Sequence, residues 1–83
     1  MSGKRRLTLW TPERLKNLRR LYGEHFGKKT ETQAELAARL GVAVSTLEWW
    51  ERGKGEPSGP SARLLDRLEE DIRAGKPREL QPA

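Results

Sequence analysis

The sequence contains no cysteine among its 83 residues, which excludes disulfide bridges, thiolate zinc sites and a cysteine nucleophile. Long apolar runs are also missing, since none approaches the roughly 18 to 20 residues that a membrane-spanning helix needs. Residues 1–6 are mostly polar and basic and no apolar stretch follows them, so we expect no signal peptide. Together these absences favour a cytoplasmic protein without membrane contact.

Residues suited to catalysis are scarce as well. His25 is the single histidine, and without a second metal ligand we expect it to be a packing residue. The sequence has no nucleophile beside a histidine base and no glycine-rich phosphate loop. The acidic run near the C-terminus alternates with arginine and is interpreted as a solvated helix face, formed by Glu69, Glu70, Asp71, Arg67 and Arg73. We therefore expect no enzyme, no cofactor and no metal site.

Positive charge, in contrast, is abundant and unevenly distributed. The formal net charge is +5 and the isoelectric point is about 10.1. Residues 1–22 hold seven basic residues and one acidic residue, a balance of +6, so residues 23–83 sum to −1. This distribution favours a polyanionic partner, although a solvated face explains a charge run equally well. Lys4, Arg5 and Arg6 either follow a DNA backbone or enter a minor groove, or they form a disordered start.

Capping signals and apolar periodicity predict four helices. Thr11 caps the first of them and Gly27 ends it, while Gly23 lies inside it and disfavours a helix there. The second begins with a capping box between Thr32 and Glu35. The helices are expected at residues 12–26, 33–40, 44–52 and 60–74. The fold is therefore expected to be all-α, a single domain of four or five helices.

The two short central helices are separated only by a tight turn at residues 41–43. Leu47 and Trp50 lie three residues apart and define the inward side of the later helix. Its other side is then free to project, as the major groove of DNA requires, and carries Val44, Ser45, Glu48, Trp49 and Arg52. An exposed Trp49 contacts either a thymine methyl or sugar, or a protein partner. Glu48 either accepts from a cytosine amine or pairs with Arg52.

This region closely resembles the helix-turn-helix family of phage lambda-type repressors and Cro, also called XRE-type. The residues that carry the resemblance are Thr32-Gln33-Ala34-Glu35-Leu36-Ala37-Ala38-Arg39-Leu40-Gly41-Val42, Ser45-Thr46-Leu47 and Trp50-Glu51-Arg52-Gly53. The stretch from Trp50 through Lys54, with Pro57-Ser58-Gly59-Pro60 and Leu64-Leu65, resembles the antitoxin branch. The likeness extends over residues 15–68. With the charge distribution and the helix-end signals, we expect a basic arm at 1–10, a helix-turn-helix DNA-binding domain at 11–75 and a loose tail at 76–83.

The resemblance also implies roles for individual residues. Base-reading positions are Val44, Ser45, Glu48 and Trp49, and phosphate-contacting positions are Gln33, Thr46, Arg52 and Lys54. Glu51 is implied to pair with an arginine of the first helix, for which Arg19 is the best match. The chain departs from the family at Ala43, where a polar cap is usual, and in its longer connection between the first two helices. None of its four base-reading positions carries the Gln, Asn or Arg that makes bidentate base contacts.

The function predicted from the sequence is sequence-preferring binding of double-stranded DNA. The chain would act as a homodimeric transcriptional repressor whose recognition helix spans residues 44–52. Two alternatives stay open. One is an antitoxin-type regulator that also binds a partner toxin, and the other is a protein-interaction module without DNA binding.

Overall fold

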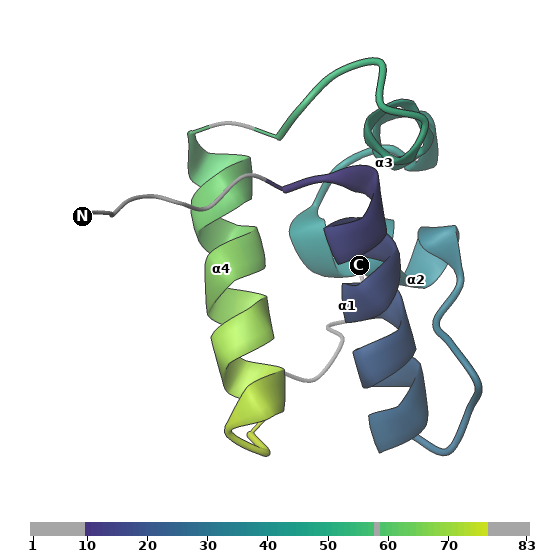
Figure 1. The fold of residues 1–83 in the computed structure, drawn as a ribbon, viewed down its shortest axis with the longest axis vertical. Coiled ribbons are helices and arrows are strands. Elements are labelled where there is room, and N and C mark those ends of the chain that lie inside the picture. The colour runs from purple at the N-terminus through teal and green to yellow at the C-terminus, as the bar shows by residue number, and fades with distance from the viewer. Residues whose placement is uncertain (1–9, 58, 77–83) are drawn as a thin grey trace.

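The computed structural model describes residues 10–57 and 59–76, and within them the chain forms four helices and no strand (Figure 1). The helices are α1 (Pro12–His25), α2 (Gln33–Leu40), α3 (Val44–Glu51) and α4 (Pro60–Arg73). These bounds differ by at most one residue from the expected ones, and the all-α prediction is confirmed. Lys4, Arg5 and Arg6 of the predicted arm lie outside the described residues, as does the predicted tail beyond residue 76.

Local signals explain where the helices begin and end. The Thr11 hydroxyl accepts a hydrogen bond from the Arg14 backbone amide, which caps α1. The Thr32 and Glu35 side chains form the complete capping box that opens α2. At Gly41 the backbone takes the left-handed conformation, with φ of 74°, and this turns the chain from α2 into α3. The tight turn between the central helices therefore depends on short-range chemistry.

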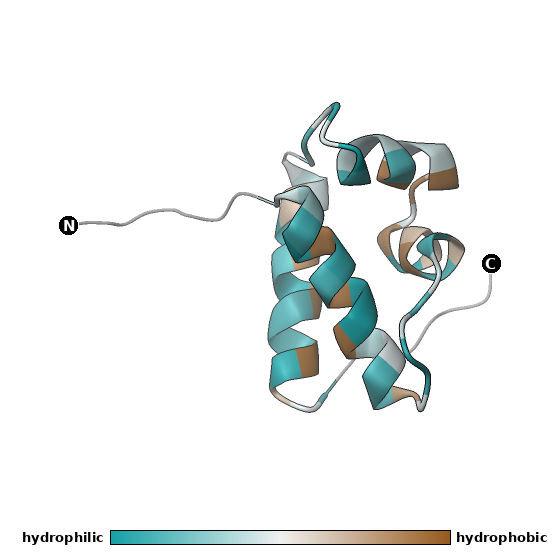
Figure 2. Cartoon of the chain, turned by 45° about the vertical axis from the view of Figure 1, so that its right-hand side comes forward, coloured by the Kyte–Doolittle hydropathy of each residue, from teal (hydrophilic) through white to brown (hydrophobic). Residues whose placement is uncertain are grey.

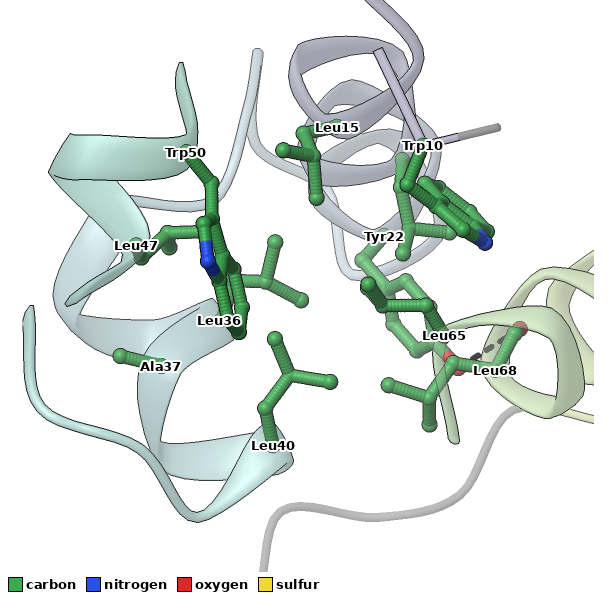
Figure 3. Close-up of a cluster of buried hydrophobic side chains, with 11 residues drawn as sticks. Trp10, Leu15, Tyr22, Leu36, Ala37, Leu40, Leu47, Trp50, Leu65 and Leu68 are labelled. Atoms are coloured by element: carbon green, nitrogen blue, oxygen red, sulfur yellow. Dashed lines mark hydrogen bonds between the residues drawn. The ribbon is translucent and has the colours of Figure 1, made fainter. Parts of the chain in front are cut away.

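The core lies where α1 and α4 meet the α2–α3 pair. Figure 3 shows Leu36, Leu40, Leu47 and Trp50 on one side, facing Leu15, Tyr22, Leu65 and Leu68 on the other. All of these side chains are buried, so the predicted inward phase of Leu47 and Trp50 is confirmed. Figure 2 shows hydrophilic residues over most of the outward faces of α1 and α4. The helices thus bury one apolar face each around a single core.

Two buried polar groups connect α4 to the rest of the domain. The Trp10 indole Nε1 donates to Asp66 Oδ1 at 2.8 Å, and the Tyr22 hydroxyl donates to the Leu68 carbonyl at 3.0 Å. Both aromatic side chains are almost fully buried, so each polar tip needs a partner and finds one on α4. Hydrogen bonds are directional, so these two constrain the position of α4 more closely than apolar contacts alone would.

The structure corrects two expectations about single residues. His25 is exposed rather than packed in the core, and its ring makes a T-shaped contact with that of Phe26, at 4.9 Å between centroids. The buried stripe of α1 ends at Tyr22 and Gly23, because the chain leaves the helix soon afterwards. Glu69 is not a solvated carboxylate, because packing of α4 on α1 brings it to Arg14, which donates to it at 2.7 and 3.2 Å.

The α1–α2 connection, residues 26–32, is more tightly packed than a polar loop needs to be. Glu31 is buried and pairs with Arg39 of α2, the two heavy atoms lying 2.6 Å apart. This packing requires glycine at position 23, because a Cβ there would lie 2.3 Å from the Thr30 Cα. The Lys28 backbone amide donates to the Gly23 carbonyl at 2.7 Å. A glycine in mid-helix therefore lets the connection lie directly on α1.

Candidate nucleic-acid interface

The predicted base-reading residues lie together on the outward side of α3. Val44, Ser45 and Trp49 are exposed and Glu48 is half-buried, whereas Leu47 and Trp50 point into the core. This separation follows from helical geometry, because residues two apart differ by about 200° in direction. Ala43 precedes the helix without a side-chain cap, as its sequence predicts. The structure thus places the four predicted base-reading residues on one face of α3.

Trp49 is held in place by the loop that follows α3. A Cβ on Gly55 would lie 2.3 Å from the indole Nε1 of Trp49, so one edge of the ring packs against this glycine. The Lys54 backbone amide donates to the Trp49 carbonyl at 3.1 Å, which keeps the loop close to the helix end. Still, 54% of the residue remains exposed. The indole is therefore oriented and still exposed. The sequence does not predict the role of Gly55, because nothing in a loop glycine indicates which side chain packs against it.

A charged network fixes α3 to the neighbouring helices. Arg19 donates to the Glu51 carboxylate through Nε and through a terminal nitrogen, both at 2.9 Å. A further Arg19 nitrogen donates to the Glu31 carbonyl at 3.0 Å. The bidentate pair is largely buried, with 17% of the Arg19 side chain and 3% of the Glu51 side chain exposed. The expected partnership of Arg19 and Glu51 is confirmed, and it joins α1 to the last residue of α3.

Gln33, the first residue of α2, is bound to the same carboxylate. Its Nε2 donates to Glu51 Oε1 at 3.0 Å, which uses one of the two hydrogens on that nitrogen. The capping box occupies the backbone amide of Glu35, while the amides of Gln33 and Ala34 stand earlier in the first turn. Those amides and the helix dipole make this end of α2 attractive to an anion. The N-terminus of α2 and the C-terminus of α3 therefore lie side by side.

The basic side chains of α1 and of the α3 C-terminus differ in whether a carboxylate pairs with them. Arg52 and Lys54 are exposed at the C-terminal end of α3, and Thr46 is half-buried in its first turn. Within residues 10–57 and 59–76, no ion pair joins Glu48 to Arg52. Arg14 and Arg19 of α1, in contrast, are engaged by carboxylates of other helices. The basic balance of the N-terminal third therefore overstates the positive charge that is free on the surface.

One carboxyl group beside the α2 N-terminus has a perturbed pKa. A hydrogen bond from the Lys28 ammonium, and then one from the Thr32 backbone amide, lower the pKa of Glu35 below its ordinary value. The same carboxylate completes the capping box. Glu35 thus stays ionised at the positive end of the helix, where a negative charge is favourable.

Other site types find little support in the described part of the chain. None of its helices is long and apolar enough to cross a membrane. It also contains no group of three or more His, Cys, Asp or Glu side chains arranged to hold a metal ion.

Comparison with known proteins adds one finding to this geometry. Residues 32–69 match a family model described as helix-turn-helix, a stretch that contains α2, α3 and most of α4. No curated protein and no solved structure matches the chain significantly. The matched stretch includes the capping box, the left-handed Gly41 and the exposed face of α3. Over residues 32–69, slightly less than half of the chain, the protein is therefore similar to the helix-turn-helix family.

Proposed function

We propose that the protein binds double-stranded DNA with a sequence preference and acts as a dimeric transcriptional repressor. The observation that carries the proposal is the outward face of α3, where Val44, Ser45 and Trp49 are exposed while Leu47 and Trp50 hold the helix on the core. The major groove admits a helix that packs on its domain through one face and leaves the opposite face exposed, as α3 does. In this proposal α3 is the recognition helix.

Each residue of the face has a chemical task. Glu48 accepts a hydrogen bond from a cytosine amine, and Ser45 donates to or accepts from a neighbouring base edge. Val44 and Trp49 offer apolar contact to thymine methyl groups or a deoxyribose. Since no side chain on this face makes a bidentate contact, each base pair is read weakly. The total preference then depends on several modest contacts.

Phosphate contacts supply most of the affinity in this scheme. Gln33 and the first amides of α2 bind one strand, and Thr46, Arg52 and Lys54 bind near α3. The predicted arm with Lys4, Arg5 and Arg6 adds sequence-independent attraction. A single small module buries a limited interface, so a homodimer on two half-sites reaches useful affinity. Residues 11–75 form the DNA-binding domain in this proposal, flanked by the arm at 1–10 and the tail at 76–83.

Selection from random duplexes tests the proposal directly. The purified chain should enrich one motif, and a dimer should enrich two copies of it about one helical turn apart. Trp49→Ala should then weaken binding to the selected duplex more than binding to a scrambled one, as measured by fluorescence anisotropy. Arg67→Ala on the exposed side of α4 is the matched control and should change neither value. Failure to enrich any motif would overturn sequence-preferring binding.

A second function is favoured by one observation. Trp49 is 54% exposed, Val44 of the same helix is exposed as well, and aromatic side chains such as Trp are common at protein interfaces. The chain would then be an antitoxin-type regulator that also binds a toxin, or an interaction module alone. If Trp49→Ala dissolves a protein complex while affinity for the selected duplex stays intact, the groove assignment for Trp49 is wrong. That result would favour the interaction function.

A further inference from the structure

A basic groove lies outside the helix-turn-helix, between α1 and the α1–α2 connection. It encloses about 430 Å³ and is open to solvent. Its walls carry four basic side chains and one acidic one, namely Lys16, Arg19, Arg20 and Lys29 with Glu13. Lys29 comes from the connection and the other four come from α1. The groove is therefore formed by two segments that only the fold brings together.

Three of these cations keep their charge available. Lys16, Arg20 and Lys29 are exposed, and no ion pair engages them among the described residues. The printed hydrogen bond of Arg20 goes to the neutral amide oxygen of Asn17, which leaves its positive charge uncompensated. Arg19 differs, because Glu51 and the Glu31 carbonyl occupy its nitrogens. Three free cations facing one hollow favour an anion there.

Backbone hydrogen bonds hold the segment that carries Lys29 against α1. On one side of Lys29 the Lys28 backbone amide donates to the Gly23 carbonyl at 2.7 Å, and on the other the Glu31 amide donates to the Arg19 carbonyl at 3.0 Å. The absence of a side chain at Gly23 lets the backbone of Thr30 rest on α1. The backbone on both sides of the groove is therefore already in place, so an anion has to order only the side chains that bind it.

The groove also adjoins the proposed DNA-reading surface. Arg19 lines the groove, yet its guanidinium reaches Glu51 at the end of α3. Gln33 at the start of α2 donates to that same carboxylate. Through the Arg19 side chain the groove is thus connected to the C-terminus of α3 and the N-terminus of α2, which the proposed function places on DNA. Figures 1 and 2 show the connection on the side of α1 opposite to α4.

We infer that this groove binds the phosphate backbone of the same duplex that α3 reads, with a phosphate between Lys16, Arg20 and Lys29. The inference rests on the proposed function and extends its contact surface beyond the helix-turn-helix. Backbone phosphate fits better than an acidic protein segment because Arg19 of the groove shares the Glu51 carboxylate with Gln33 at the α2 N-terminus, itself an end that favours anions. Lys and Arg side chains that contact phosphates rather than bases add affinity without reading the sequence.

The test compares two variants of equal charge. Lys16→Gln, Arg20→Gln and Lys29→Gln together neutralise the groove. Three exposed cations of α4 and its end serve as the control, with Arg63→Gln, Arg67→Gln and Lys76→Gln. Binding to a selected and a scrambled duplex is measured between about 50 and 300 mM salt for the wild type and both variants, because the slope of log K against log salt reports the number of phosphates neutralised. Thermal melting checks that both variants stay folded.

The groove variant should lose affinity for both duplexes alike, by about tenfold or more at 0.1 M salt, and more than the control loses. Its plot of log K against log salt should be shallower than that of the wild type by at least about 1 for each bound protomer. Equal slopes and equal affinities in the two variants would overturn the inference while leaving DNA binding by α3 intact. Loss of an acidic protein partner with an unchanged duplex slope would also overturn it. A wild type that binds no duplex would instead remove the proposed function itself.

Discussion

Replacing Glu51 with alanine is expected to destabilise the domain strongly, although no apolar packing is lost. The carboxylate accepts two hydrogen bonds from Arg19 at 2.9 Å and one from Gln33 at 3.0 Å. Its removal leaves the Arg19 guanidinium with 17% of the side chain exposed and a single carbonyl partner, that of Glu31. An uncompensated charge at such a site is the main cost.

Breaking a buried ion pair by removing one partner costs about 3 to 5 kcal/mol. The remaining carbonyl bond and the partial exposure of Arg19 reduce this, so we expect about 2 to 4 kcal/mol for Glu51→Ala. A domain of this size has a total stability of roughly 4 to 12 kcal/mol, which makes the loss a large fraction. The melting temperature should fall by about 10 to 25 °C.

The assay is a double-mutant cycle on thermal and urea unfolding followed by circular dichroism. Arg19→Met removes the charge and keeps an apolar stem, so the double variant should be less destabilised than the two single losses added together. Glu24→Ala, at an exposed carboxylate of α1, is the control and should change stability by less than about 0.5 kcal/mol. A coupling energy near zero would refute the reasoning, because it would mean that Arg19 does not depend on Glu51.

Three further predictions follow from other parts of the structure. Trp50→Ala should lower the free energy of unfolding by about 3 to 5 kcal/mol in urea titrations, because it leaves a cavity between α3 and the core, and a loss below 1 kcal/mol would contradict its burial. Gly55→Ala should displace the Trp49 indole, so anisotropy should report weaker binding to the selected duplex and nearly unchanged binding to a scrambled one; equal losses on both would argue against an oriented indole. The lowered pKa of Glu35 means that its stabilising charge is fully present above about 4.5 and is lost as pH falls through the lower folded pKa. Glu35→Gln should therefore unfold with less pH dependence in the acid range than wild type, and identical acid profiles would dismiss the interaction with Lys28.

Short-range features of the fold follow from the sequence alone. Thr32 and Glu35 lie three residues apart, so their capping box needs only the helix that they start. Gly41 takes a left-handed conformation that other residues rarely adopt. Leu47 and Trp50 share a side of α3 by helical periodicity, which also determines that Trp49 is exposed. These facts depend on residues within one or two turns of each other, and periodicity is enough to predict them.

The long-range partnerships needed the tertiary structure. Glu31 reads as a loop residue, yet it is buried because the connection folds onto α1 and brings its carboxylate to Arg39. Only the family resemblance predicts the pairing of Arg19 with Glu51, since nothing local relates residues 32 positions apart.

The same distinction separates the two parts of the proposed DNA-binding surface. The face of α3 is a property of one helix, whose periodicity assigns each residue to the inside or the outside. The basic groove joins Lys29 to Lys16 and Arg20 across a turn of the chain, and it exists because Gly23 lets the connection lie directly on α1. Sequence spacing determines which side of a helix a residue occupies, whereas the angle and distance at which segments pack decide which charges meet.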